Sequence, residues 1–168
     1  MPATIENEAI NQELTELDPN LEGAVADSGN VVRFLTFISD GLYFGVHTDK
    51  VIEIINNHMI RPLPMVPDYV RGIINLRGQI IPIIDMRLRM GKPFQEYNSK
   101  TCIVILEIDS NIIGIVVDSV SQVIDIDLDQ TSPIPTENRQ ELTNSMISLE
   151  DGTVILLLEC EAIIDSHM

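Results

Sequence analysis

Tryptophan is absent from this chain of 168 residues, and all aromatic residues together make up only 4% of the sequence. The hydrophobic content is nevertheless 45%, so the interior must be built from Ile, Val and Leu. Because β-branched side chains pack well on pleated sheets, this composition favours a β-rich fold. The length fits one domain of ordinary size or two closely joined lobes.

Cysteine is scarce, and the two that occur, Cys102 and Cys160, form neither a CxxC pair nor a metal-ligand spacing. We therefore expect buried, reduced thiols and a fold that does not depend on a disulfide. Long apolar runs are also missing, since VILLL at 154–158 is far too short to span a bilayer. The first residues, MPATIENEAI, lack the basic and apolar regions of a signal peptide, so a cytoplasmic protein without membrane insertion is expected.

Motifs that carry catalysis are absent as well, because the sequence has no GxSxG elbow and no GxxxxGK loop. His47, His58 and His167 are at least eleven residues apart and form no HExxH or similar ligand pattern, so no metal or cofactor is expected. Asp49 and Asp118 could meet as a carboxylate pair, although turn residues explain them more simply. A small β-barrel enzyme or ligand-binding domain is kept as the alternative function.

Positive charge is limited and unevenly placed in a chain whose formal net charge is -16. Residues 1–30 hold seven acids and no Lys or Arg. Seven of the ten basic residues lie between 61 and 100, namely Arg61, Arg71, Arg77, Arg87, Arg89, Lys92 and Lys100. A solvated face that balances the acidic remainder is the simplest explanation. Nucleic acid is a poor partner, because the net charge repels phosphate and basic residues do not alternate with aromatic ones.

The composition divides the chain into three parts. Residues 1–30 combine low hydrophobicity, many acids and the pair Asp18-Pro19, which predicts a disordered, acidic lead-in that buries little. From Val31 onward, short apolar runs are separated by Gly, Asp, Asn and Pro, as is typical of strands and hairpins. We therefore predict a folded domain over 31–165 and a tail over 166–168.

An internal repeat is visible in two hairpin patterns, VRFLTFI-SDG-LYFGV and TCIVILEI-DSN-IIGIVV. A shift of 69 places superposes Asp40, Gly45, Asp49 and Val51 on Asp109, Gly114, Asp118 and Val120. After a slip of five residues, RGQII at 77–81 also meets DGTVI at 151–155. These matches predict two similar β-lobes.

The repeat singles out Arg77, because the glycine after it recurs whereas the arginine itself is replaced by Asp151. The turn therefore does not require arginine. Either Arg77 is kept for a function outside the scaffold, or it forms a salt bridge with Glu53 or Asp85. Around this turn we expect Gly78 to allow the bend, Pro82 to sit where no donor is needed, and Ile73, Ile74, Ile80 and Ile81 to anchor the strands in the core.

The segment GIINLRGQIIPIIDMR closely resembles the signature of the CheW family, whose members couple chemoreceptors to the histidine kinase CheA. Further blocks resemble the family in order, namely FLTFISDGLYFGVHTDKVIEII, IRPLPMVPDYVRG, IIGIVVDSVSQVI and DGTVILLLECEAII. The chain departs from the pattern at Ser145-Met146, where many relatives have Gly before an aliphatic residue, and over 135–144, which looks abbreviated. The resemblance implies a mainly β fold of two SH3-like, five-stranded barrel lobes that share a hydrophobic core, with a short helix or two.

The resemblance also implies a non-catalytic adaptor between chemoreceptors, the methyl-accepting chemotaxis proteins, and CheA. Such an adaptor is cytoplasmic and is recruited to membrane-associated receptor arrays. The family's receptor-binding groove lies between the lobes, and its residues correspond here to Val51, Glu53, Gly72, Asn75 and Arg77.

Each of these residues also has a purely structural explanation. On that explanation Val51 is a core residue, Glu53 a solvated charge, Gly72 a backbone requirement and Asn75 a side chain that serves its own turn. Arg77 is the strongest candidate, because a planar guanidinium can bind a carboxylate or backbone carbonyls with two hydrogen bonds.

The resemblance places the kinase-binding surface on the first lobe. We look for it around the hairpin 42–46, where Leu42, Phe44 and Val46 are candidates if their side chains are exposed. For any single one of the three, core packing is the role that we expect first.

Overall fold

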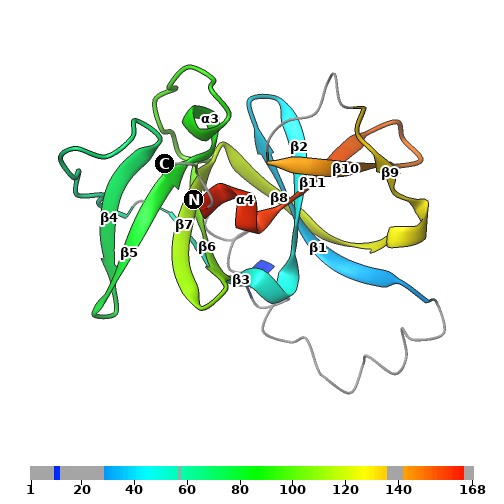
Figure 1. Ribbon diagram of the computed structural model, residues 1–168, viewed down its shortest axis with the longest axis horizontal. Helices are drawn as coiled ribbons and strands as arrows, with labels where there is room; N and C mark the ends of the chain where they lie inside the picture. Colours follow the sequence, from blue (N-terminus) through cyan, green and yellow to red (C-terminus); the bar gives the residue numbers. More distant parts are fainter. Residues whose placement is uncertain (1–9, 12–28, 57, 136–141, 165–168) are drawn as a thin grey trace.

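The computed structural model describes residues 10–11, 29–56, 58–135 and 142–164 (Figure 1). Its strands are β1 (Val31–Ser39), β2 (Leu42–His47), β3 (Val51–Ile55), β4 (Val70–Leu76), β5 (Gln79–Asp85), β6 (Cys102–Ile108), β7 (Asn111–Val117), β8 (Ser119–Asp127), β9 (Ser132–Pro133), β10 (Thr143–Ser148) and β11 (Val154–Leu158). The short helices are η3 (Thr48–Lys50), α3 (Met86–Arg89), η4 (Leu128–Gln130) and α4 (Cys160–Ile164). The prediction of a mainly β fold with few short helices is confirmed.

The predicted lead-in and tail fall almost wholly outside the described residues. Within the first 28 residues only Ile10 and Asn11 are described, and the tail at 166–168 is not described. None of the described helices is long and apolar enough to cross a membrane.

The strands form two sheets that appear as two lobes side by side in Figure 1. The five-stranded lobe has the order β3-β6-β7-β5-β4, and the six-stranded lobe has the order β8-β1-β2-β11-β10-β9. Each lobe combines strands from both halves of the chain, because β1 and β2 join β8–β11 while β6 and β7 join β3–β5. The hairpin 42–46 therefore does not share a sheet with β3–β5, as a simple division of the chain into two successive lobes would require.

The repeat seen in the sequence has a structural counterpart in the two hairpins β1–β2 and β6–β7. Asp40 and Gly41 have φ of 53° and 74°, and Asp109 and Ser110 have φ of 49° and 70°. Two positive φ values in succession define the type I′ turn that suits the twist of a two-residue hairpin. Both hairpins therefore turn in the same way, although only one of them has glycine at the second position.

A glycine in the second strand of each hairpin lets a parallel strand approach closely. Gly45 lies opposite Leu157 of β11, and Gly114 lies opposite Ile83 of β5, which are positions related by the slip of five residues in the repeat. A Cβ on Gly114 would lie 2.7 Å from Ile83 Cδ1, whereas one on Gly45 would lie 3.2 Å from its nearest neighbours. The same packing device thus occurs twice and is tighter in the five-stranded lobe.

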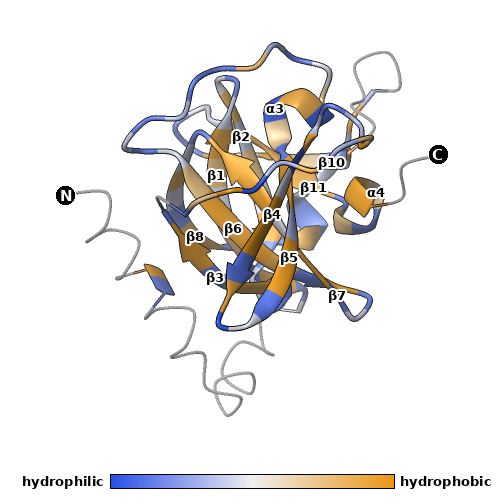
Figure 2. Ribbon diagram, turned by 90° about the vertical axis from the view of Figure 1, so that its left-hand side faces the viewer, coloured by the Kyte–Doolittle hydropathy of each residue, from blue (hydrophilic) through white to orange (hydrophobic). Residues whose placement is uncertain are grey.

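The core confirms that the two lobes share one hydrophobic interior. Its largest cluster contains Phe37 and Phe44 from the six-stranded lobe together with Val104 and Ile115 from the five-stranded lobe. Each lobe also has a smaller cluster of its own. Figure 2 shows the corresponding orange, apolar stretches along β4, β5 and β6. Cys102 and Cys160 are both buried, as predicted.

Ion pairs reinforce the junction between the lobes. Arg87 Nη2 lies 2.7 Å from Asp118 Oδ2, and Arg87 Nη1 lies 2.9 Å from Asp40 Oδ1 in the β1–β2 turn. The hydrogen bonds from Arg87 to Asp118 raise the pKa of Arg87. Asp49 is paired instead with His47, so Asp49 and Asp118 have separate partners and form no carboxylate pair.

The expectation that four isoleucines anchor the strands β4 and β5 is only partly correct. Ile74 and Ile81 are buried in the core of the five-stranded lobe. Ile73 is half-buried, and Ile80 is 56% exposed. Successive side chains of a strand point to opposite faces, so neighbouring isoleucines cannot all face the core.

Candidate partner-binding site

The turn between β4 and β5 holds Arg77 in an unfavourable backbone conformation. Arg77 has φ of 53° and Gly78 has φ of 84°, which gives a type I′ turn. Such turns favour Asn, Asp or Gly at the first position, because a larger side chain is strained in the left-handed region. In the other lobe, the corresponding turn has a positive φ only at Gly152. An arginine kept at such a position indicates a use for its guanidinium group.

That guanidinium group is bound to Glu53 of β3 through two hydrogen bonds. Arg77 Nη1 donates to Glu53 Oε1, and Arg77 Nη2 donates to Glu53 Oε2 at 3.0 Å. The hydrogen bonds and the charge of Glu53 raise the pKa of Arg77. The side chain of Arg77 is nevertheless 71% exposed, against 20% for Glu53. Glu53 therefore orients the arginine while its outer face stays open to solvent.

Of the two salt bridges considered for Arg77, the structure contains the one with Glu53. Asp85 is buried and has other partners, since its carboxylate accepts hydrogen bonds from Leu88 N at 3.1 Å and from Tyr97 Oη at 2.7 Å. An exposed ion pair contributes little to stability. The pair with Glu53 consequently fixes the orientation of the Arg77 guanidinium group and adds little to the stability of the fold.

Two of the predicted site residues have structural tasks, Asn75 at this turn and Gly72 farther back along β4. Asn75 Oδ1 accepts a hydrogen bond from Gly78 N at 2.9 Å, so its side chain closes the turn. Gly72 has φ of 140°, and a Cβ there would lie 1.9 Å from the carbonyl oxygen of Arg61. The structural explanations of Asn75 and Gly72 therefore hold: Asn75 closes the turn that presents Arg77, and Gly72 allows the close approach of the Arg61 backbone.

Val51 lies at the start of β3, where it is half-buried and packs against the shared core. A register shift between Val51 and Glu53 indicates a β-bulge, which redirects the side chains that follow. The structure thus brings Glu53 and Arg77 together at the surface. Val51, at the start of the same strand as Glu53, mainly packs against the core.

Exposed isoleucines beside this pair were not identified from the sequence. Ile52, directly before Glu53, is 43% exposed, and Ile80, three residues after Arg77, is 56% exposed. Strict alternation along β5 would have indicated Ile80, because its neighbour Ile81 is buried. Apolar surface is therefore exposed on β3 and on β5, the strands next to the Arg77–Glu53 pair in sequence.

The three kinase-binding candidates do not form the exposed surface that we looked for. Phe44 and Val46 are fully buried in the shared core, and Leu42 is half-buried against it. Core packing therefore explains Phe44 and Val46, which present no side-chain surface to a partner in this conformation. The exposed apolar residue of this hairpin is Tyr43, at 37% exposure.

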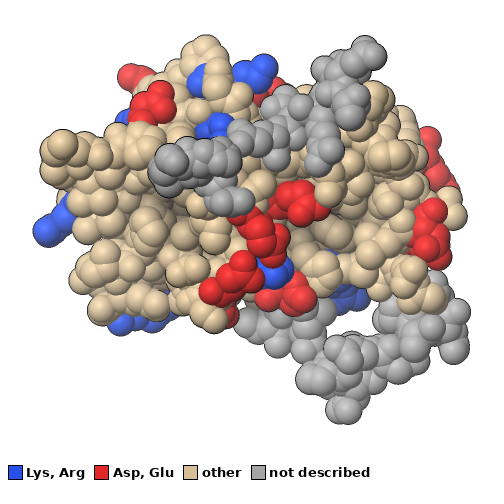
Figure 3. Space-filling model, in the orientation of Figure 1, with Lys and Arg blue, Asp and Glu red and all other residues tan. Residues whose placement is uncertain are grey.

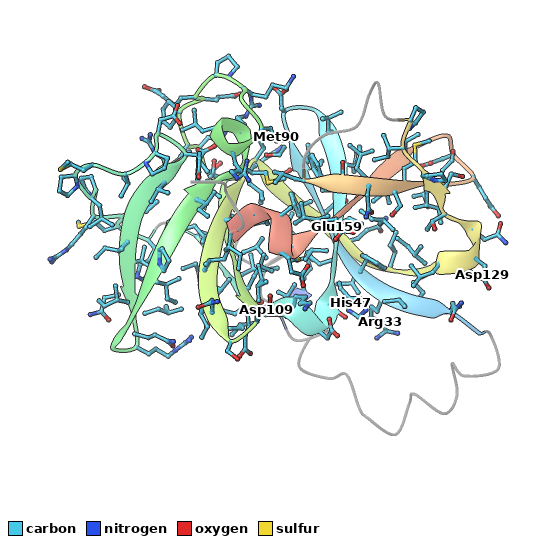
Figure 4. The ribbon with its side chains drawn as sticks, in the orientation of Figure 1. Arg33, His47, Met90, Asp109, Asp129 and Glu159 are labelled. Atoms are coloured by element: carbon cyan, nitrogen blue, oxygen red, sulfur yellow. The ribbon has the colours of Figure 1, made fainter. Side chains whose placement is uncertain are left out.

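The surface charge follows the division into lobes. The seven basic residues between 61 and 100 belong to the five-stranded lobe or to its loops. In Figure 3 acidic side chains gather in the middle of the molecule, and most of the visible basic ones lie on its left-hand side. Figure 4 shows Arg33 and His47 near each other on the six-stranded lobe, where Arg33 pairs with Asp125 at 3.0 Å.

The described residues provide little for a cofactor. No group of three or more His, Cys, Asp or Glu residues within them is placed to hold a metal ion. A cleft of about 70 Å³ is lined by His58, Ile60, Tyr97, Asn98, Thr101, Ile103 and Val116. Pockets for drug-sized ligands are several times larger, on the order of 300 Å³ or more. This cleft therefore gives no support to a small-molecule site.

Comparison with known proteins gives one consistent result. A family model described as the CheW-like domain matches residues 33–168. The chain is 34% identical over 103 residues to the chemotaxis protein CheW of Klebsiella aerogenes, covering 61% of this chain and 62% of that protein. It is 30% identical over 150 residues to the chemotaxis protein CheW of Thermotoga maritima, covering 84% of this chain and 93% of that protein.

A solved structure has the same fold. The crystal structure of the scaffolding protein TtCheW from Thermoanaerobacter tengcongensis aligns with a TM-score of 0.76 and 27% identity. The alignment covers 81% of this chain and 94% of that one. This likeness confirms the prediction of two SH3-like lobes.

Proposed function

The chain belongs to the CheW-like domain family of chemotaxis coupling proteins, and we propose that it joins chemoreceptors to a CheA-like histidine kinase. The observation that carries this proposal is the presentation of Arg77. A strained type I′ turn, closed by Asn75, holds the arginine against Glu53 with most of its side chain exposed. The equivalent turn of the other lobe carries Asp151 in its place.

The proposed receptor-binding surface consists of Arg77 and Glu53, with Val51 beneath them and Gly72 and Asn75 shaping the backbone. Its partner is the cytoplasmic tip of a receptor, which is a bundle of helices. Helix ends expose carbonyl oxygens, and carboxylates are frequent on helix surfaces, so both suit an arginine. The side chain of Arg77 has further N–H groups besides the two that bind Glu53, and these are free to take part.

The proposed kinase-binding surface is the outer side of the hairpin formed by β2 and its neighbours. Leu42 and Tyr43 are the residues of this hairpin with exposed side-chain surface, since Phe44 and Val46 are buried. Tyr43 also lies next to β11, where Val154 is 43% exposed. Tyrosine, with an apolar ring and a polar hydroxyl group, is frequent in protein interfaces, so Tyr43 is the leading residue of this surface.

Binding is proposed to be the whole activity of the protein, within the unit 31–165. We place it in the cytoplasm, where receptor tips and the kinase would recruit it to membrane-associated arrays. The alternative of a small β-barrel enzyme or ligand-binding domain is not favoured, because the comparisons find coupling and scaffolding proteins of the same fold. Hydrolysis of ATP or of a phosphorylated partner by the purified protein alone would speak for that alternative.

The decisive experiment replaces Arg77 and follows two partners separately. Arg77→Ala should weaken binding to a soluble receptor-tip fragment by about tenfold to a hundredfold, as expected when a charged interfacial hydrogen-bonding group is lost. Arg77→Glu should weaken it further through charge repulsion. Binding to the regulatory domain of the kinase and the thermal midpoint should stay nearly unchanged.

The matched control is Asp151→Ala, on the equivalent turn of the other lobe, which should leave receptor binding unchanged. Unfolding of Arg77→Ala would show that the arginine is structural. Normal receptor coupling by Arg77→Glu would show that the site is wrongly placed.

A further inference from the structure

A contact from the N-terminal region covers the outer edge of β3. Asn11 Nδ2 donates to the carbonyl oxygen of Ile54 at 3.1 Å, and Ile54 N donates to Asn11 Oδ1 at 3.0 Å. Strand β3 is an edge strand of its sheet, so this side of Ile54 has no neighbouring strand. The side-chain amide of Asn11 thus takes the place that the peptide group of another strand would occupy.

The residue before it strengthens the contact. Ile10 is only 8% exposed and belongs to the hydrophobic cluster shared by the two lobes, to which Ile54 also belongs. The two residues lie beside β3 in Figure 1, where they are drawn in deep blue. Glu53, the partner of Arg77, directly precedes Ile54 on the same strand. The contact therefore lies immediately next to the proposed receptor-binding surface.

We propose that Ile10 and Asn11 occupy part of the partner-binding surface at the outer edge of β3 and compete with the partner that binds there. This inference rests on the proposed function and adds an occupant to its site. The charge of the surrounding sequence supports it, because residues 1–28 hold seven acids and no Lys or Arg. The sequence on both sides of Ile10 and Asn11 therefore has the charge that the site is proposed to recognise in its partner.

The contact is weak enough to be displaced. It consists of two hydrogen bonds between neutral groups and one apolar side chain, and it must offset the entropy lost when the chain around it becomes ordered. A partner that binds only the uncovered edge has its apparent affinity reduced by the fraction of molecules in which that edge is free. Weakening the contact should therefore strengthen partner binding.

The test is the substitution Asn11→Ala in the full chain, with Asn111→Ala as the matched control. Asn111 is an exposed asparagine at the start of β7, and its side chain donates a local hydrogen bond to the carbonyl oxygen of Asp109 at 3.3 Å. In Asn11→Ala the amide of Ile54 should exchange its hydrogen faster, and binding to the receptor-tip fragment should tighten by about threefold to tenfold. Asn111→Ala should change neither measurement.

A second variant separates competition from a general loss of structure. Asn11→Asp keeps an acceptor for Ile54 N but sets a carboxylate oxygen against the carbonyl oxygen of Ile54, so it should break the contact and tighten partner binding as Asn11→Ala does. Binding of the receptor-tip fragment to the wild type should also speed the exchange of the side-chain amide protons of Asn11, because the partner displaces the asparagine from Ile54.

Each outcome decides the proposal. If Arg77→Ala weakens binding while Asn11→Ala leaves it unchanged or weaker, the contact is structural and only this inference fails. If neither the wild type nor Asn11→Ala binds the fragment, the proposed function fails together with it. Binding by Asn11→Ala alone would show complete competition and support the inference.

Discussion

The two lobes share the geometry of the hairpins β1–β2 and β6–β7 but differ at a second pair of equivalent turns, where one lobe has Arg77 and the other has Asp151. In the five-stranded lobe, Arg77 is bound to Glu53 and keeps most of its side chain exposed. In the six-stranded lobe, Asp151 Oδ1 accepts a hydrogen bond from Thr153 N at 2.9 Å, which lowers the pKa of Asp151. Asp151 therefore serves its own loop, whereas Arg77 is held out by another strand. The difference in exposure and partner singles out Arg77, and not Asp151, as the residue of the two that can reach a partner.

The largest expected effect comes from removing Arg87, whose ion pairs join the two lobes. Arg87→Ala leaves the carboxylates of Asp40 and Asp118 without their arginine in a partly buried site. We expect a loss of about 2 to 3 kcal/mol in the free energy of unfolding, somewhat less than for a fully buried pair. Unfolding by a chemical denaturant measures this loss in the free energy of unfolding.

Its control is Arg33→Ala, because the pair of Arg33 with Asp125 is exposed and lies within one lobe. That substitution should cost less than about 1 kcal/mol. Equal losses for the two variants would mean that the junction between the lobes has no special role.

A smaller effect should distinguish the two equivalent glycines. Gly114→Ala forces a Cβ to within 2.7 Å of Ile83 Cδ1, so we expect a loss of about 1 to 3 kcal/mol from overpacking. Gly45→Ala places its Cβ at 3.2 Å from the nearest side chains and should cost clearly less. Thermal unfolding of the two variants gives the comparison. A larger loss for Gly45→Ala would contradict the tighter packing of the five-stranded lobe.

The smallest effect concerns pH and the turn at Asp151. The pKa of Asp151 is lowered in the folded state, so its stabilising contribution is present above the unfolded value of about 3.9 and is lost as the pH falls through the folded value. Asp151→Asn should therefore lower the thermal midpoint slightly at neutral pH and leave it unchanged in strong acid. A difference that persists in strong acid would show that the carboxylate charge is not responsible.

Much of the architecture follows from residues that the sequence makes visible. Asp40-Gly41 and Gly45 recur as Asp109-Ser110 and Gly114 because the same turn and the same close approach are needed twice. The pair of Arg77 with Glu53 was one of two open alternatives, and only the structure could choose between Glu53 and Asp85. The exchange of hairpins between the lobes could not be predicted, because sequence patterns do not determine which distant strands pair.

The burial of Phe44 and Val46 agrees with the core role expected for each of them singly, whereas the exposure of Ile80 and the contact of Ile10 escaped prediction, all for identifiable reasons. Phe44 and Val46 are buried because β2 lies between two strands and faces the shared core, where an apolar side chain is not evidence of an exposed surface. Ile80 is exposed because it alternates with Ile81. Ile10 contacts the core although the composition around it predicts disorder. Composition is an average over many residues, whereas this contact depends on a single side chain.

The central claim is that Arg77 binds the receptor through its place in the five-stranded lobe, and a reciprocal charge exchange tests it most directly. The double variant Arg77→Asp with Asp151→Arg moves the positive charge to the equivalent turn and leaves the net charge of the chain unchanged. Titration with a receptor-tip fragment should show an affinity at least about tenfold weaker than that of the wild type, while the thermal midpoint stays nearly the same. Wild-type affinity in this variant would contradict the claim, because the position of the arginine would then be irrelevant.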